Sequence, residues 1–308
     1  MRAKFLALAA LVLGLASCQT EPEGLNVNVG GEVETTVCVS LPETTRATDS
    51  AEGAFKNVDL TGDATIRYIL KIYQKVGEEY RASGDRQVEF SDEKSVVFPV
   101  RLVPNRDYRF VVWADYVESE ADVDYHYNTA DLTNVTLNRT WVAMDETRDA
   151  FTATKEVTYG STATIDLTLT RPFAKLRVIT TDMEQLNDLN IKPSKATVEY
   201  TVPHYNAFNA FAGEAIGDSK NRNIKHENFT IKAYGDNVND ESKVLFTDYF
   251  FANNDVVWFY LTVYDQNGND IGGTIAFNTD INVKRNHLTT ISGNVLTDGN
   301  NIKVLWRN

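Results

Sequence analysis

Few residues of this sequence have the types and spacing that catalysis or metal binding requires. Asp122, Asp124 and His126 alternate, so on a strand they would share one face and could ligate a metal ion. A solvated loop rich in Tyr and Asp is the favoured interpretation. Residues 265–270 resemble a calcium-binding loop but lack the Gly and the closing Glu that such a loop needs. Because Asn-Gly lies inside this segment, we predict a hairpin turn here. For the chain as a whole we expect no metal, no cofactor and no catalytic residue.

The N-terminus carries the clearest chemical signal. Arg2 and Lys4 precede an apolar run that ends at Ser17 and Cys18. The run spans about twelve residues, too few to cross a bilayer, and is typical of a secretory signal peptide. Its end, Leu-Ala-Ser-Cys, resembles a bacterial lipobox. The lipobox implies that residues 1–17 are removed as a signal peptide and that lipid such as palmitate is attached to the Cys18 thiol.

The composition narrows the class of protein. The chain has 308 residues and a formal net charge of −13, and this acidity argues against nucleic-acid partners, which need a basic face. Two cysteines are too few for a disulfide-rich scaffold or a four-cysteine metal site. The length is typical of two domains. The tryptophans are interpreted as core residues in preference to a sugar-binding platform, at positions 113, 141, 258 and 306.

Alternation of apolar and polar residues recurs along the chain and predicts half-buried strands. Short strands separated by turns are typical of sandwiches, so we predict an all-β fold. Residues 182–190 and 205–217 are less periodic and are expected to form short helices or loops. A domain boundary is predicted near Arg171, because a proline follows it. The predicted strands cover residues 36–41, 66–72, 96–103, 108–113, 162–170, 176–180, 196–202, 256–264 and 274–277.

Several segments together resemble the fimbrillin family of Bacteroidales, in particular its fimbrillin-A-like lipoprotein branch. They are residues 102–115, 149–151, 171–178 and 283–297. The resemblance implies two tandem transthyretin-like β-sandwich domains, at residues 47–170 and 171–308, behind a lipidated tether and removable first strand at residues 18–46. It implies a subunit or accessory protein of type V fimbriae that supports adhesion. The implied partners are other pilus subunits, in a homo- or hetero-polymer, the outer membrane through lipid on Cys18, and a maturation protease.

The same resemblance implies an assembly mechanism. A protease cuts after a basic residue and removes the first strand, and a strand from the next subunit enters the groove. The removed strand is expected to be an edge strand, and its removal leaves unpaired backbone groups and an apolar slot. Arg46 is the only basic residue between Cys18 and Lys56. Cleavage between Arg46 and Ala47 would release the strand that carries Val37, Val39 and Leu41; the alternative is an ordinary loop arginine.

Three further positions carry open alternatives. The C-terminal segment alternates, with Ile302, Val304 and Trp306 on one face, and is either a donor strand or the last strand of its own sandwich. Ser50 lies in a short motif that resembles an O-glycosylation signal. Cys38 is expected to be a buried apolar residue, with cross-linking between chains as the alternative.

Two questions on function stay open at the level of sequence. Acidic residues after Cys18 resemble a surface-export signal, and a plain solvated tether is the alternative. Stalk, tip and anchor roles in a fimbria are all compatible with the motifs. The alternative function is a permanently anchored surface lipoprotein that binds glycan or a host protein.

Overall fold

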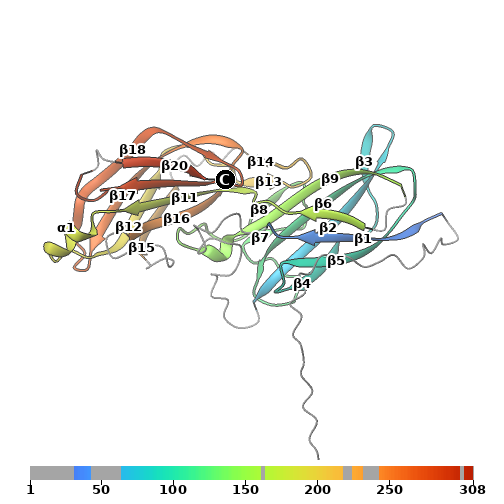
Figure 1. Ribbon diagram of the computed structural model, residues 1–308, viewed down its shortest axis with the longest axis horizontal. Helices are drawn as coiled ribbons and strands as arrows, with labels where there is room; N and C mark the ends of the chain where they lie inside the picture. The colour runs from blue at the N-terminus through green and yellow to red at the C-terminus, as the bar shows by residue number, and fades with distance from the viewer. Residues whose placement is uncertain are drawn as a thin grey trace, which may run out of the picture.

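The computed structural model describes residues 31–42, 64–160, 164–217, 224–231, 243–298 and 302–307. Within these ranges the chain forms two β-sandwiches placed end to end, with a small sheet between them (Figure 1). The prediction of an all-β sandwich fold is confirmed. No helix in the described ranges is long and apolar enough to cross a membrane.

The first sandwich packs a three-stranded sheet against a five-stranded sheet. Its strands are β1 (Val33–Ser40), β2 (Thr65–Val76), β3 (Glu79–Ala82), β4 (Gln87–Ser91), β5 (Ser95–Leu102), β6 (Arg106–Val117), β9 (Ala150–Tyr159) and β10 (Thr164–Thr168). The smaller sheet has the order β10-β1-β5, and the larger has the order β3-β2-β6-β9, with β4 also paired to β2. Alternate residues of β5, from Val96 to Leu102, are buried in the core between the sheets, as the period of two predicts.

The second sandwich is built from two four-stranded sheets. Its elements are β11 (Phe173–Thr180), α1 (Met183–Asp188), β12 (Pro193–Tyr200), β15 (Ile224–Thr230), β16 (Lys243–Phe251), β17 (Asn254–Asp265), β18 (Asp270–Lys284), β19 (Leu288–Gly293) and β20 (Ile302–Arg307). The sheet orders are β16-β11-β19-β20 and β15-β12-β17-β18. The hairpin predicted around residues 265–270 is confirmed, because β17 and β18 pair antiparallel on either side of it.

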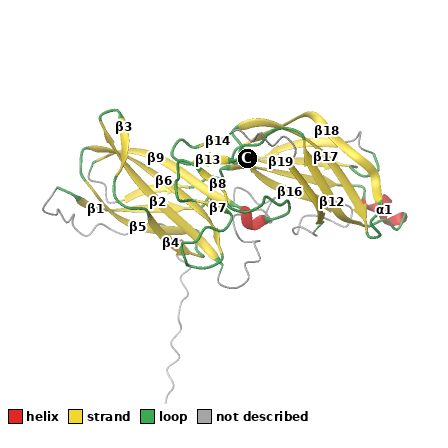
Figure 2. Cartoon of the chain, turned by 180° about the vertical axis from the view of Figure 1, so that it is seen from behind, coloured by secondary structure: helices red, strands yellow, loops and turns green. Residues whose placement is uncertain are grey.

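A small sheet, which we call the bridging sheet, joins the two sandwiches. It has the order β14-β13-β8-β7, and its strands are β7 (Tyr127–Asn128), β8 (Val135–Leu137), β13 (Ala207–Asn209) and β14 (Glu214–Ile216). β8 comes from the chain of the first sandwich and β13 from the chain of the second, and they pair antiparallel. Figure 2 shows this sheet between the sandwiches from behind. The expectation of helices or loops at residues 205–217 was wrong, because strands of three residues are too short to show a period.

A separate apolar cluster fills the space between the sandwiches. Trp113 and Phe251 are each at most 3% exposed and belong to this cluster, although they come from different sandwiches. The cluster explains why β2 is apolar on both faces: Tyr68 packs into the core of the first sandwich, while Ile69 packs into the cluster between the sandwiches. The buried interface therefore holds the two sandwiches in one arrangement.

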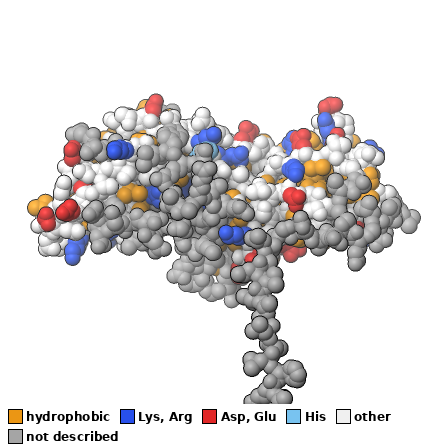
Figure 3. Space-filling view, viewed as in Figure 1, with side chains coloured by type: hydrophobic (Ala, Val, Ile, Leu, Met, Phe, Trp, Pro, Cys, Tyr) orange, Lys and Arg blue, Asp and Glu red, His pale blue; other side chains and the backbone are white. Residues whose placement is uncertain are grey.

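Charged side chains are distributed over the surface without a dominant patch on the visible face. In Figure 3 the basic and acidic side chains of the described residues alternate across both sandwiches.

Candidate functional site

The family resemblance implies a removable first strand, and the structure describes that strand, β1, in full. β1 lies between two neighbours, antiparallel to β5 from Val33 to Ser40 and parallel to β10 from Thr36 to Ser40. We call the space that β1 fills the β1 slot; β5, β10 and the facing five-stranded sheet form its walls. The expectation of an edge strand was wrong, because β10 returns to the sheet from more than a hundred residues later in the chain.

The inward side chains of β1 are among the most deeply buried of the molecule. Val37 and Val39 are 0% exposed and Leu41 is 3% exposed, and all three belong to the core of the first sandwich. Val37 lies opposite Phe98 of β5 on one side and opposite Ile165 of β10 on the other. If β1 were absent, both neighbouring strands would lose their backbone partners and an apolar groove would open to water.

The thiol of Cys38 lies on the other face of β1. It is 7% exposed, and the structure places it in no disulfide within the described ranges. The prediction that Cys38 is a buried small residue is therefore confirmed.

The positions expected to be processed lie outside the described residues. These are Ser17 and Cys18 at the signal cleavage site, Arg46 and Ala47 at the maturation site, and the candidate glycosylation residue Ser50. They stay predictions. β1 ends at Ser40 and the next described strand begins at Thr65, so Arg46 lies in the covalent connection between them.

The candidate donor strand occupies the edge of a sheet. β20 pairs antiparallel with β19 along its whole length, from Gly293↔Ile302 to Leu288↔Arg307. Its side chain at Val304 is 42% exposed. Position 306 pairs with Thr289 along the backbone. In this structure β20 therefore completes its own sandwich as an edge strand, on the opposite half of the molecule from the β1 slot (Figure 1).

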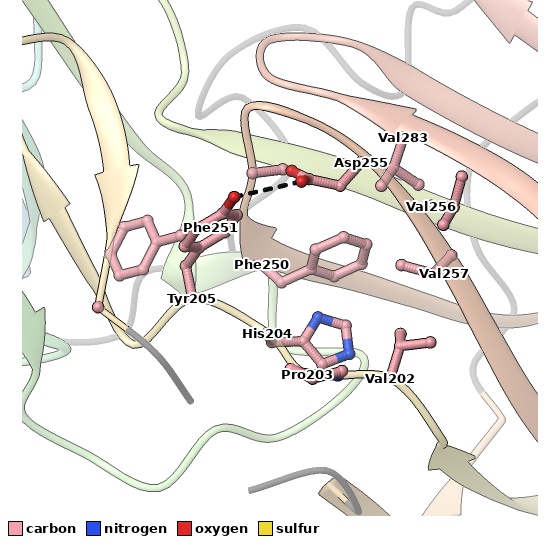
Figure 4. A pocket seen from close by; sticks show the side chains of 12 residues that line it. Val202, Pro203, His204, Tyr205, Phe250, Phe251, Asp255, Val256, Val257 and Val283 are labelled. Atoms are coloured by element: carbon pink, nitrogen blue, oxygen red, sulfur yellow. Dashed lines mark hydrogen bonds between the residues drawn. The ribbon is translucent and has the colours of Figure 1, made fainter. Parts of the chain in front are cut away.

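A second candidate site is an apolar pocket of about 600 Å³ in the second sandwich. Figure 4 shows the ring of Phe250 and the side chains of Val257 and Val283 around it, with the imidazole of His204 beside them. The hydroxyl group of Tyr205 donates a 3.3 Å hydrogen bond to Asp255 at its rim. An apolar lining with few polar groups suits the apolar part of a small ligand or a peptide side chain.

Behind this pocket lies a buried polar cluster around Asp248, which is 1% exposed. The indole N–H of Trp141 and the hydroxyl group of Tyr200 donate hydrogen bonds of 2.6 and 2.8 Å to its carboxylate. The Nε2 atom of His226 lies 3.3 Å from the same carboxylate. Burial alone would raise the pKa of Asp248, but His226 and the donors bring that pKa below its ordinary value. Trp141 comes from the connection after β8, so the cluster fastens a loop of the first sandwich into the second.

The imidazole of His204 makes the stability of the fold sensitive to acid. His204 is 5% exposed, and burial lowers its pKa from the ordinary 6.5 to about 4. The unfolded chain takes up this proton near pH 6.5 and the folded chain only near pH 4, so the free energy of unfolding falls as the pH drops through this window. We expect His204 to lower that free energy by about 2 kcal/mol at pH 5 relative to pH 7.

Urea denaturation at pH 7 and pH 5 checks this expectation. In His204→Asn the drop in unfolding free energy between the two pH values should be smaller than in the parent protein by that amount. Burial raises the pKa of Asp115 to about 6, which changes stability in the opposite direction over part of the same window. Both proteins share that effect, so the difference between them isolates His204. An equal drop in both proteins would show that His204 does not carry the sensitivity.

The most conspicuous group that the sequence analysis missed is an ion cluster around Arg67. The guanidinium group donates to both carboxylate oxygens of Asp115 at 3.0 and 2.9 Å, to Asp122 at 2.9 Å and to Asp124 at 3.0 Å. The side chains of Arg67 and Asp115 are fully buried. Asp122 and Asp124 therefore hold the loop after β6 onto β2. The segment is the loop that the sequence predicts, and the side chains of Asp122 and Asp124 are 38% and 27% exposed.

A search of solved structures finds chains that are similar to this one over most of their length. A candidate cell adhesion protein from Bacteroides eggerthii is similar, with a TM-score of 0.43 and 16% identity over 89% of this chain and 95% of that one. A candidate cell adhesion protein from Bacteroides uniformis gives 0.44 and 13%, over 91% and 98% of the two chains. The tip fimbrial protein Mfa3 from Porphyromonas gingivalis, with a C-terminal truncation, gives 0.47 and 12%, over 89% and 98%.

The chain also matches a sequence-family model over most of its length. No curated protein matches the chain. One family model, described as a family of unknown function, matches residues 26–306, which include every strand from β1 to β19 and nearly all of β20. The chain belongs to this family of unknown function, DUF6562.

Proposed function

We propose that the protein is the lipid-anchored precursor of a structural or accessory subunit of a fimbria. In this proposal Cys18 carries the anchor, a protease cuts between Arg46 and Ala47, and β1 leaves its slot. A strand from another subunit then fills the slot, and the resulting fibre supports adhesion at the cell surface. The single observation that carries the proposal is the position of β1, which is central in its sheet and buried but precedes the predicted cleavage site.

The physical reason is that an empty β1 slot is unstable alone and complementary to a strand. Loss of β1 deprives β5 and β10 of their shared partner and exposes the apolar groove. A strand from a neighbour restores the backbone pairing, and its alternate side chains refill the groove. The slot therefore favours assembly as soon as β1 is removed.

The placement of the two strands supports a linear polymer. The β1 slot lies in the first sandwich and β20 is the edge strand of the second sandwich. If β20 of one subunit enters the slot of the next, the contact is head-to-tail and does not close on itself, which generates a filament. The side chain of Val304 on β20 is exposed, whereas those of Val37 and Val39 on β1 are fully buried.

The test treats the purified protein with an Arg-specific protease. The expected products are a shortened chain that begins at Ala47 and a ladder of polymers on denaturing gels. The variant Arg46→Ala should keep its N-terminal segment and form no ladder, because β1 stays in its slot. Absence of a cut at Arg46 in the parent protein, or a cut without a ladder, would contradict the proposal.

A matched variant that ends at residue 301 identifies the donor. It lacks β20 but keeps Arg46 and the whole β1 slot. If β20 is the donor, this variant is cut as efficiently as the parent protein but gives no ladder. A normal ladder from the shortened variant would assign the donor to another segment.

A further inference from the structure

The junction of the two sandwiches contains a second cavity, which we call the Arg285 cleft. Its volume is about 510 Å³, and both sandwiches and the bridging sheet contribute to its lining. Thr154 and Glu156 come from β9, Thr170 from the chain that follows β10, Phe211 from the turn between β13 and β14, and Arg285 from the turn between β18 and β19. Cavities at such junctions are common ligand sites.

Arg285 is held in place by its turn. Its backbone N–H donates to the carbonyl group of Asn253 at 3.0 Å, and its own carbonyl oxygen lies 2.8 Å from Nδ1 of His287. Asn286 adopts a positive φ of 61°, and its backbone N–H donates to the carbonyl group of Phe173 at 2.7 Å. These contacts fix the direction in which the Arg285 side chain leaves the turn, so the cleft has a preorganised cation.

The charge of Arg285 has no counter-ion in the part of the chain that the structure describes. No carboxylate forms an ion pair with it, and its guanidinium group lies 5.8 Å from the centre of the Phe208 ring. Burial lowers the pKa of Arg285 from its ordinary value. A half-buried cation without a partner is costly, and an anion from outside would relieve that cost.

Arg109 supplies a second cation, and part of its hydrogen-bonding capacity is used by protein groups. It pairs with the exposed carboxylate of Glu156, and its guanidinium carbon lies 4.3 Å from the centre of the Tyr80 ring and 4.2 Å from that of Phe211. Its Nε atom is buried without a hydrogen-bond partner among the described residues. The two positive charges of Arg109 and Arg285 exceed the single negative charge of Glu156, so the cleft is locally positive although the protein as a whole is acidic.

The threonines of the cleft favour hydroxyl groups, whereas the arginines favour an anion. The hydroxyl group of Thr152 donates to the carbonyl group of Val112 at 2.8 Å, and that of Thr154 donates to the carbonyl group of Ala210. Thr170 donates to the carbonyl group of Thr152 at 3.4 Å. Because each hydroxyl hydrogen is already used, these oxygens can only accept further hydrogen bonds. They suit a ligand with hydroxyl donors.

We propose that the Arg285 cleft binds an acidic sugar, a hydroxyl-bearing ring with one carboxylate group. The carboxylate pairs with Arg285, ring hydroxyl groups donate to the threonine oxygens, and an apolar ring face lies against Phe211. This site is separate from the β1 slot, and it would stand even if the strand-exchange proposal failed.

Calorimetric titration of the purified protein with three probes tests the ligand chemistry. The probes are glucuronate, glucose, which has a hydroxymethyl group in place of the carboxylate, and acetate, which has the carboxylate without the ring. We expect glucuronate to bind at least about tenfold more tightly than either control. Equal binding of glucose would overturn the anion site, and equal binding of acetate would overturn the sugar site.

Three variants locate the binding. Arg285→Ala should weaken glucuronate binding at least about tenfold, whereas Arg101→Ala, which removes an exposed arginine from β5, should leave it unchanged. Glu156→Gln should strengthen binding several-fold, because it removes the carboxylate that competes for Arg109. Unchanged affinity in Arg285→Ala would overturn the proposal. Circular dichroism shows whether Arg285→Ala is folded. If it is not, the test rests on Glu156→Gln, and an unchanged affinity of that variant for glucuronate would overturn the proposal.

Discussion

Replacing Val37 with Asp is expected to unfold the first sandwich of the uncleaved protein. Val37 is 0% exposed and lies between Phe98 and Ile165, where a carboxylate would meet only apolar neighbours across the sheet. Burying such a group without a partner costs at least about 4 kcal/mol. Urea denaturation of the intact protein measures the loss, which is a large part of the stability of an ordinary domain.

Thr36→Asp is the matched control for this variant. Thr36 is the neighbour of Val37 on β1, lies on the opposite face and is partly exposed. An Asp at that position should change the free energy of unfolding by less than about 1 kcal/mol. Equal effects of the two substitutions would contradict the burial of β1. Once β1 has been released, Val37→Asp and the parent protein should have the same stability, because the altered residue is no longer part of the subunit.

The second large effect is expected from Arg67→Met. Methionine keeps much of the apolar stem of Arg67 but leaves the fully buried carboxylate of Asp115 without its bidentate partner. Breaking a buried ion pair from one side costs about 3–5 kcal/mol. Asp122 and Asp124 lose the same anchor, so we also expect faster hydrogen exchange in the loop after β6. Urea denaturation and exchange mass spectrometry measure the two effects.

Two controls separate burial from charge. Arg101→Met breaks an exposed pair with Glu34 and should cost at most about 1 kcal/mol. The double variant Arg67→Met with Asp115→Leu removes both buried charges and should recover part of the lost stability. If Arg67→Met costs no more than Arg101→Met, the buried cluster does not stabilise the fold.

The sequence predicted β1 well but could not predict its neighbours. The alternation of Val37, Val39 and Leu41 marks a strand with one buried face, because the period of two is local. Whether a strand is central or at an edge depends on partners such as β10, which is paired through contacts between distant parts of the chain. The expectation of an edge strand failed for that reason.

The missed sites share a physical cause. Arg67 stands in the apolar run of β2, and a charged residue inside a strand that is buried on both faces is a signal of a buried ion pair. Its partners lie 48 to 57 residues away, so their number and identity cannot be read locally. Arg285 gives no such signal, because its importance comes from the lack of an ion-paired carboxylate among the residues that the structure describes.

The most direct measurement is the N-terminal residue of the protein isolated from the cell surface, determined by mass spectrometry. If β1 is removed and its slot is filled by another subunit, the surface protein in fibres begins at Ala47. If every surface copy begins at the lipid-bearing Cys18 with β1 still attached, strand exchange at the β1 slot is contradicted, and the protein is a permanently anchored surface lipoprotein.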